Sequence, residues 1–370
     1  MSGLQDVRLD PQRRRAHLQP GVTSALLAAS AHPHGLALTT GDSATVAVGG
    51  LVVGGGIGLM SRKYGLTIDH LLAAEVVTVD GRLLRASADE HPDLFWALRG
   101  GGGNFGIITS LEFALHEVGT VLGGAVFFSA AEGARVLRGY ADYALQAPEE
   151  LTTILAVMQA PPLPFIPAER HGELVLAVLV CCVGDLDQGQ RAVAPLRALG
   201  TPIADVTAPM PYPALFQLTQ ESTRRGRQHA IRSMFTRAVD DALIATILEH
   251  AARRTSPLGM VQIRALGGEM ARVPADATAF AHRDQPFMLT IINSWEDPGQ
   301  APRHAAWTLE LFEALRPRAS GAYVNFLGDD GAQRLRSAYS SSAYARLTAV
   351  KRAYDPTNFF AVNHNIAPSA

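Results

Sequence analysis

Apolar and polar residues alternate in short runs over the first third of the chain, which predicts short strands and helices. The clearest signal is LLAAEVVTVDGRLLRAS, residues 71–87, where apolar residues alternate on both sides of Asp80-Gly81. Asp-Gly between two such runs is typical of a two-residue turn, so this stretch predicts a β-hairpin. The other elements predicted here are two short strands within 4–20, a helix over 23–31, a strand over 34–41, a helical turn or two over 59–64, a helix over 91–99 and an extended segment over 104–118.

The middle of the chain has longer apolar runs separated by amphipathic stretches. Strands are predicted over 123–129, 151–158, 173–180, 260–266 and 287–295. Helices are predicted over 130–146, 186–199, 240–254 and 302–316. This order predicts an α+β fold in which an antiparallel sheet is covered on one face by helices.

Composition excludes several classes of partner. The 370 residues are 48% hydrophobic and 18% charged, with a formal net charge of −2. This balance gives no electrostatic reason to expect binding to nucleic acid or to an anionic membrane. The longest apolar runs, such as ELVLAVLVCCV, are too short to span a bilayer. The first twenty residues carry charges and lack the apolar core of a signal peptide, which favours a cytoplasmic protein.

The two cysteines, Cys181 and Cys182, are neighbours in an apolar run. Adjacent cysteines rarely pair with each other, so we interpret them as packing residues in a reducing compartment. The chain has no His-Glu-x-x-His sequence and no clustered Cys/His spacing. No metal site is therefore predicted.

A dense glycine segment lies between residues 49 and 58. It contains Gly49, Gly50, Gly54, Gly55, Gly56 and Gly58. Glycine loses more conformational entropy on folding than any other residue, so such a cluster needs a physical reason. Backbone without Cβ atoms allows close approach of a pyrophosphate or a flat ring, which favours cofactor contact. A strained turn within a tight β structure is the alternative.

A second glycine run contains a dinucleotide-like pattern. Gly101, Gly103 and Gly106 form G-x-G-x-x-G. That fingerprint binds a dinucleotide when a strand precedes it and a helix follows it. Here a predicted helix precedes it and the β-branched IITSLEF follows, so a nicotinamide-binding Rossmann fold is not expected.

Three separated stretches together resemble the FAD-linked oxidases of the berberine bridge enzyme type, within the vanillyl-alcohol oxidase (PCMH-type) fold group. They are GGGIGLMSRKYGLTIDHLLAAEVVTVDG, DEHPDLFWALRGGGGNFGIITSLEF, and YVNFLGDD followed by YDPTNFFAVNHNI. The resemblance implies a two-lobed FAD-binding domain interrupted by a substrate domain. It also implies oxidation of a small organic substrate by hydride transfer to flavin N5, with O2 as the usual electron acceptor.

The resemblance assigns boundaries and cofactor-binding residues. Residues 1–117 correspond to the second lobe of the FAD-binding domain, 118–320 to the substrate domain and 321–370 to the C-terminal segment that returns to the flavin. The expected FAD-binding residues are Gly41, Ser43, Thr45, Val48, Gly49, Gly54, Gly55, Gly56, Gly58, Ile107 and Asn363.

The chain also departs from the family pattern. The first flavin lobe, whose histidine forms the covalent bond to FAD, has no counterpart, and Ile68 replaces the cysteine of doubly linked members. Any FAD is therefore expected to bind non-covalently. These departures suggest a truncated gene product, a mis-assigned start codon or one half of a split protein, which a separate chain supplying the missing lobe would complete. The alternative is a non-catalytic remnant that does not bind FAD without that lobe.

The predicted catalytic residues lie in Tyr323-Val324-Asn325-Phe326, which is expected to be a strand facing the flavin. In many relatives the fourth position of this motif is a tyrosine that acts as base; Phe326 cannot accept a proton. Tyr323 and Asn325 remain as candidates, with Tyr323 as a residual base or a substrate hydrogen-bonding group. The alternative is that Tyr323 packs with its hydroxyl satisfied.

Overall fold

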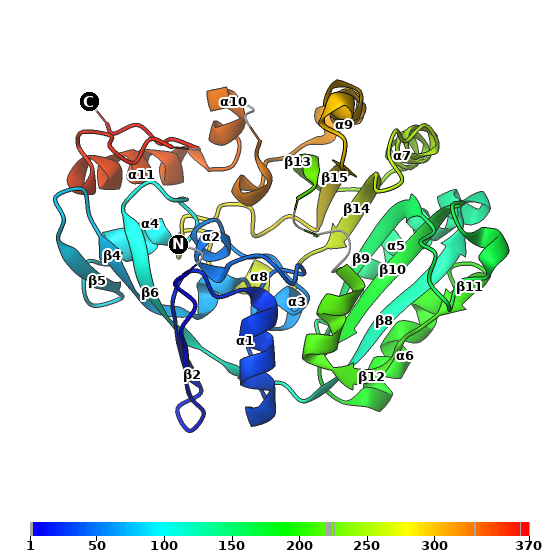
Figure 1. The fold of residues 1–370 in the computed structure, drawn as a ribbon, viewed down its shortest axis with the longest axis horizontal. Coiled ribbons are helices and arrows are strands. Elements are labelled where there is room, and N and C mark those ends of the chain that lie inside the picture. Colours follow the sequence, from blue (N-terminus) through cyan, green and yellow to red (C-terminus); the bar gives the residue numbers. More distant parts are fainter. Residues whose placement is uncertain (1–2, 220–223, 225, 329–330, 363, 370) are drawn as a thin grey trace.

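The first part of the chain forms a five-stranded antiparallel sheet (Figure 1). The computed structural model describes residues 3–219, 224, 226–328, 331–362 and 364–369. The strands run in the order β1 (Val7–Asp10), β2 (Arg15–Leu18), β6 (Ile107–Ala114), β4 (Leu71–Val77) and β5 (Leu83–Ser87). β4 and β5 are the predicted hairpin, and Gly81 in its turn has φ +79°. The hairpin prediction is therefore confirmed.

Short helices connect these strands. They are α1 (Ser24–Ala31), α2 (Val48–Val53), α3 (Ser61–Tyr64) and α4 (Pro92–Leu98), and a two-stranded sheet joins β3 (Leu36–Ala37) to β7 (His116–Glu117). Thr23 caps α1 by accepting a hydrogen bond from the Leu26 amide. α4 precedes the second glycine run and β6 follows it, so the rejection of a Rossmann fold is confirmed.

The middle of the chain forms an eight-stranded antiparallel sheet, seen on the right of Figure 1. Its order is β11 (Pro202–Asp205), β8 (Thr120–Ser129), β10 (Leu174–Cys182), β9 (Leu151–Gln159), β14 (Met260–Ala265), β15 (Phe287–Trp295) and β13 (Gln228–Thr236), with β12 (Ala208–Pro211) also paired to β8. The five predicted strands are all present, whereas β11, β12 and β13 were not predicted. β11 and β12 are short, whereas β13 has nine residues and forms one edge of the sheet.

Helices cover one face of this sheet. They are α5 (Gly133–Ala144), α6 (Leu186–Arg197), α7 (Asp241–Ala252) and α9 (Ala301–Leu315), and α8 (Glu269–Arg272) is a single turn elsewhere. Their apolar sides share one core with alternate residues of the central strands, such as Leu155, Ile263 and Leu289. Residues on the opposite face, such as Phe235 and Met288, instead join the core of the first part. The open face of the eight-stranded sheet therefore packs toward the five-stranded sheet. Cys181 and Cys182 are buried free thiols, as predicted.

The C-terminal part returns to the first part of the chain. It contains α10 (Gly331–Arg336) and α11 (Ser341–Tyr354), and α11 packs against α4 (Figure 1). The ammonium of Lys351, fully buried, donates to Asp355 Oδ2 at 2.6 Å, to the Asn104 carbonyl at 2.8 Å and to the Phe360 carbonyl at 2.9 Å. The side-chain nitrogen Nδ2 of Asn104 donates to the His364 carbonyl, and its side-chain oxygen Oδ1 accepts from the Ile366 backbone amide. This network joins the second glycine run to the end of the chain.

Lys351→Met should therefore destabilise the protein strongly. The variant leaves the fully buried Asp355 carboxylate without its cation, and breaking a buried ion pair costs about 3–5 kcal/mol. Arg253→Met is a matched control, because it removes a pair of the same i,i+4 spacing that is exposed to solvent, with an expected cost below about 1 kcal/mol. Urea unfolding of both variants measures the difference. Equal losses would show that Lys351 does not stabilise the returning segment.

Two histidines form a buried pair near β7. His116 Nε2 lies 3.0 Å from His70 Nδ1, and the Tyr64 ring stacks on His116 with centroids 4.0 Å apart. Burial, together with the charges of His70 and Arg14, lowers the pKa of His116 to about 4. Burial also lowers the pKa of His70, against the opposing charge of Asp69. Both rings are therefore neutral in the folded protein at neutral pH.

This pair should make stability depend on pH in the acid range. A histidine whose folded pKa lies below its unfolded value stabilises the fold fully above about pH 6.5, and this stabilisation is lost as pH falls toward about 4. His116→Gln can still hydrogen-bond His70 but cannot take up a proton. We expect the melting temperature of the wild type to fall more steeply than that of His116→Gln between about pH 7 and pH 4.5. Parallel curves in scanning calorimetry would contradict this.

Candidate functional site

Protein atoms occupy the space beside the glycines from Gly54 to Gly58. A Cβ atom would stand 2.0 Å from Asn325 Oδ1 at Gly54, 2.1 Å from Thr67 Oγ1 at Gly56 and 1.4 Å from the Thr40 carbonyl oxygen at Gly58. Gly55 and Gly56 also have φ of +132° and +86°. Close approach and left-handed backbone both require glycine here. The groups that approach these four glycines belong to the protein itself.

Tyr323 binds this glycine turn through its hydroxyl oxygen. The oxygen accepts hydrogen bonds from the Gly56 amide at 2.9 Å, the Ile57 amide at 3.3 Å and Asn325 Nδ2 at 2.9 Å. The side chain is only 2% exposed. Burial raises the pKa of Tyr323 above its ordinary value, although the three donors and the charge of Arg264 act in the opposite direction. The phenol therefore stays protonated at neutral pH.

The prediction of a strand over Tyr323–Phe326 is wrong. Val324–Phe326 form a short 3₁₀ helix, η9, in which the Phe326 amide donates to the Tyr323 carbonyl at 2.9 Å. In a strand the side chains of Tyr323 and Asn325 would have pointed the same way along a flat surface. The tight turn instead brings both onto the glycine segment. Asn325 Nδ2 also donates to the Leu51 carbonyl at 2.9 Å, which fixes the orientation of its amide.

A cavity of about 410 Å³ lies where the two glycine runs meet the C-terminal segment. Its walls are lined by Pro20, Gly49, Gly50, Val53, Gly102, Gly103, Asn104, Gly106, Ile107, Ile108, Val324, Asn325, Val362 and His364. We call it the glycine-lined cavity. At Gly50 and Gly103 no atom lies within 4 Å of the position that a Cβ would take, so bare main chain borders open space. A phosphate or a flat ring can approach such backbone closely, and these residues therefore fit FAD.

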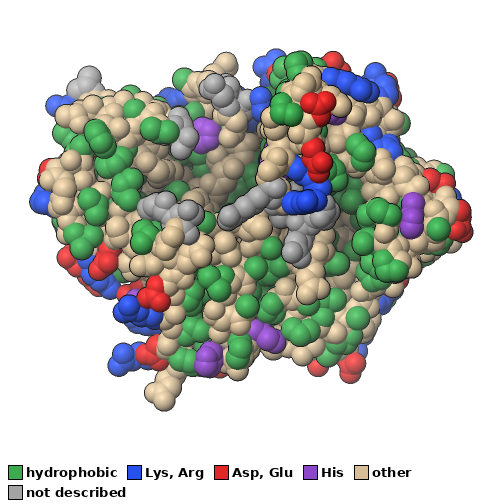
Figure 2. Space-filling view, viewed as in Figure 1, with side chains coloured by type: hydrophobic (Ala, Val, Ile, Leu, Met, Phe, Trp, Pro, Cys, Tyr) green, Lys and Arg blue, Asp and Glu red, His purple; other side chains and the backbone are tan. Residues whose placement is uncertain are grey.

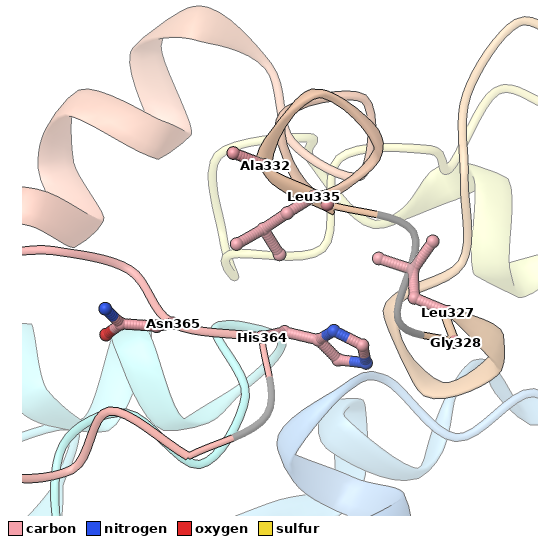
Figure 3. Close-up of a pocket in the computed structure, with 7 residues that line it drawn as sticks. Leu327, Gly328, Ala332, Leu335, His364 and Asn365 are labelled. Carbon is pink, nitrogen blue, oxygen red and sulfur yellow. The ribbon is translucent and has the colours of Figure 1, made fainter.

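A second cavity of about 660 Å³ lies between α10 and residues 364–365 (Figure 3). Leu327, Gly328, Ala332 and Leu335 form one side, and the His364 ring points toward Leu327 and Gly328. The oxygen Oδ1 of Asn365 is buried and has no hydrogen-bond partner among the residues that the structure describes. Figure 2 shows the surface hollowed just below α10. His364 lines both cavities, so the C-terminal segment separates them.

The structure brings some of the predicted cofactor-binding residues together and leaves others apart. Gly49 and Ile107 line the glycine-lined cavity, and so does Asn325, which was predicted as a catalytic residue. Gly41, Ser43 and Thr45 lie in the loop before α2, and Val48 is fully buried with its amide bonded to the Val22 carbonyl. Asn363 lies outside the described residues. The assignment of FAD contacts to these positions stays a prediction.

Other residues of the glycine-lined cavity were not predicted as site residues. They are Pro20, Gly50, Val53, Gly102, Gly103, Asn104, Gly106, Ile108, Val324, Val362 and His364. Gly102 and Gly103 belong to the run whose dinucleotide pattern was rejected, and His364 belongs to the C-terminal sequence Asn-His-Asn-Ile. The glycine content of these segments indicated a binding site. Which of their residues lie together depends on the tertiary fold, which the sequence pattern did not give.

A buried ion pair lies beside η9. Arg264 Nη1 is 2.8 Å from Asp42 Oδ2, and the guanidinium carbon is 5.9 Å from the centre of the Phe326 ring. Arg264 is 4% exposed, so its charge is compensated within the protein. The positive charge next to Tyr323 is therefore already paired with a carboxylate.

Two classes of site are absent from the described part of the chain. No three His, Cys, Asp or Glu side chains among these residues gather as metal ligands. Among the same residues, no helix combines the length and the apolar character needed to cross a bilayer.

Sequence comparison connects both ends of the chain to flavoprotein families. Residues 1–87 match the family described as FAD binding domain, and residues 322–367 match the family described as berberine and berberine like. The (R)-6-hydroxynicotine oxidase of Paenarthrobacter nicotinovorans is 32% identical over 386 residues, an alignment that covers 99% of this chain and 80% of that protein. An uncharacterized FAD-linked oxidoreductase of Bacillus subtilis (strain 168) is 28% identical, with 100% and 80% covered.

Solved structures share the fold along the whole chain. The crystal structure of 6-hydroxy-D-nicotine oxidase from Arthrobacter nicotinovorans matches with a TM-score of 0.87 at 28% identity, covering 100% of this chain and 82% of that one. A berberine-bridge-enzyme-like protein of Arabidopsis thaliana, number 28, has the same TM-score at 24% identity and the same coverage. The predicted α+β, PCMH-type fold is thus confirmed.

Gly54→Ala and Gly50→Ala should have opposite effects on stability. At Gly54 the new methyl group would collide with the Asn325 amide and displace it from Leu51 and Tyr323, at a cost of about 1–3 kcal/mol. At Gly50, inside α2, nothing lies within 4 Å, and alanine should stabilise the helix by about 0.5–1 kcal/mol. Chemical unfolding measures both. Adding Asn325→Ala to Gly54→Ala should recover part of the loss, because the two residues are in contact.

If Gly54→Ala proved as stable as Gly50→Ala, the packing of η9 on the glycine turn would be refuted.

Proposed function

Because this chain belongs to the FAD-linked oxidases of the berberine bridge enzyme type, we propose that it oxidises a small organic molecule with FAD as cofactor and O2 as electron acceptor. The observation that carries the proposal is the glycine-lined cavity. Three segments far apart in sequence contribute bare backbone, an amide side chain and an imidazole to it, and the C-terminal segment that belongs to the family signature forms its wall. The substrates tested first are those of the relatives, beginning with 6-hydroxynicotine.

The residues proposed to hold FAD line the cavity, and two of them, Gly50 and Gly103, have open space beside their backbone. Gly49 and Gly50 at α2, Gly102 and Gly103 in the second run, and Ile107 at the start of β6 surround it. Bound there, FAD would take a hydride from the substrate and pass two electrons to O2, giving hydrogen peroxide. The chain's own task is to hold the ring and the substrate together and to keep bulk water from both.

We propose different roles for the two predicted catalytic residues. Asn325 lines the cavity with a fixed amide and is the candidate to contact a ligand. Tyr323 is buried, and three N–H donors surround its oxygen, which suits a positioning residue that holds the Gly55–Ile57 turn against η9. The donors would also stabilise the phenolate if Tyr323 lost its proton, which is what a residual base requires.

FAD is proposed to bind without a covalent bond. Ile68, at the position of the cysteine in doubly linked members of the family, is fully buried and carries no reactive atom. Ile107 and Val362 line the cavity and are 43% and 78% exposed, although both are apolar. This exposure favours a second candidate: a chain that binds FAD only when a further polypeptide segment or a separate chain covers this side.

Titration with FAD tests the proposal. Wild-type protein should change the absorbance of FAD between about 350 and 500 nm, and the colour should be lost on acid precipitation because no covalent bond holds it. Gly50→Leu should weaken binding by at least about tenfold, since the side chain would enter the glycine-lined cavity. Gly119→Leu is the control, because Gly119 is exposed, has open space around it and lies outside the cavity.

Equal affinity for FAD in Gly50→Leu and Gly119→Leu would refute the cavity as the cofactor site. Absence of any binding by the wild type would favour the second candidate. Production of hydrogen peroxide on addition of 6-hydroxynicotine or another member of a substrate panel would then test the activity itself.

A further inference from the structure

One side chain of the C-terminal segment borders both the glycine-lined cavity and the second cavity, which lies between α10 and residues 364–365. The residue is His364, and its ring points toward Leu327 and Gly328, whereas the Asn365 side chain points away from them (Figure 3). A molecule in the second cavity would therefore meet this imidazole. The proposed flavin site lies on the other side of the same residue.

The imidazole of His364 is available to a ligand. The residue is partly buried, and neither ring nitrogen makes a hydrogen bond to the described part of the chain. Neither nitrogen is closed off from solvent in the way that Asn365 Oδ1 is. The main chain is fixed, because Asn104 Nδ2 donates to the His364 carbonyl at 3.1 Å and Asn104 Oδ1 accepts from the Ile366 amide at 2.9 Å. A fixed backbone with an uncommitted ring suits a group that acts on a bound molecule.

His364 supplies the sole titratable side chain in the described lining of these two cavities. The arginines of α10 are turned to aromatic rings elsewhere. The guanidinium carbon of Arg334 lies 4.5 Å from the centre of the Phe312 ring, and that of Arg336 lies 3.9 Å from the centre of the Tyr344 ring. Imidazole is the side chain that changes its charge between about pH 5 and pH 8, so it can take up a proton near neutral pH.

The proposed oxidation needs such a group. A carbon that carries an O–H or N–H group loses a hydride and a proton when it is oxidised. Phe326 has no basic atom, and Asn325 offers only an amide. Tyr323 keeps its proton at neutral pH and lines neither cavity. His229 is a further imidazole, but it lines a cavity of about 570 Å³ beside β13 and not the glycine-lined cavity.

We propose that the second cavity binds the substrate and that His364 is the catalytic base, which takes the proton of an O–H or N–H group on the carbon that is oxidised. This inference rests on the proposed oxidase function, because it names the substrate class and the base of that reaction. The C–H bond breaks, and its hydrogen leaves with the electron pair to FAD. The O–H or N–H bond breaks, its proton goes to a ring nitrogen of His364, and its electron pair forms the second bond of a carbonyl or an imine.

The pH dependence of hydrogen peroxide production by the FAD-loaded protein tests the base, with a substrate that does not itself titrate. Wild-type kcat/KM should fall by about tenfold per pH unit once the imidazole is protonated. His364→Gln cannot take up a proton, so its kcat/KM should be at least about 100-fold lower and should not change between about pH 5 and pH 8. His229→Gln is the matched control and should keep the wild-type profile. A wild-type rate and profile in His364→Gln would overturn the base and leave the oxidase function standing.

A binding test that needs no FAD examines the second cavity. The probes are benzyl alcohol, which offers an O–H group, and benzyl methyl ether, which does not. In calorimetric titration of the full chain at about pH 8, the alcohol should bind about fivefold more tightly than the ether, because the neutral imidazole accepts its hydrogen, and His364→Leu should remove this preference.

A cavity-filling variant tests the same site without changing His364. Ala332→Trp should abolish binding of both probes, since Ala332 is an exposed residue of α10 that lines the second cavity. Gln333→Trp is the matched control, because Gln333 is the next exposed residue of α10 and does not line the cavity.

Failure of this proposal and failure of the oxidase function are distinguishable. Absence of probe binding, equal binding of alcohol and ether by the wild type, or unchanged binding in Ala332→Trp would overturn the second cavity as the substrate site, even in a protein that binds FAD and forms peroxide. Binding that depends on His364 in a protein that ignores FAD would support the second cavity and count against the oxidase function.

Discussion

The whole arrangement depends on one steric constraint: Gly54, Gly55, Gly56 and Gly58 must carry no Cβ atom. The Asn325 amide, the Thr67 hydroxyl and the Thr40 carbonyl reach into the space that Cβ atoms would occupy at Gly54, Gly56 and Gly58. Tyr323 then reaches the amides of Gly56 and Ile57 and fastens the C-terminal segment to the first part of the chain. A larger residue at Gly54 would collide with Asn325 and push η9 outward from the wall that it forms.

A second set of contacts completes the closure from the far side. The side chains of Lys351 and Asn104 together bind five backbone carbonyl or amide groups of the second glycine run and the C-terminal segment, and Asp355 neutralises the buried ammonium. Buried charges of this kind are stable only when all partners are in place, so the segment docks as a unit. The two glycine runs thus have different tasks. The first receives η9, and the second receives the chain end while leaving main chain open to the glycine-lined cavity.

Local signals in the sequence predicted local structure well, and failures arose where distant segments decide the outcome. The β4–β5 hairpin followed from Asp80-Gly81 and the alternation of apolar residues on both sides of it. α2 was not foreseen, because glycine disfavours helix and only tertiary packing overrides that preference. β13 was not predicted because polar residues interrupt its apolar pattern, as they do in a half-buried edge strand. Gly49, Ile107 and Asn325 were predicted and do meet at one cavity, whereas Gly50 and His364 could be assigned only once the folds of three segments were known.

Asn325 lines both the glycine-lined cavity and a cavity of about 570 Å³ beside β13. Its side-chain amide donates hydrogen bonds to the Leu51 carbonyl and the Tyr323 hydroxyl. A molecule that binds in one cavity and moves this amide would change the shape of the other cavity. If binding in one cavity moves this amide, occupancy of the two cavities is thermodynamically linked, and the linkage is reciprocal: whatever one ligand does to the affinity of the second, the second does equally to the first.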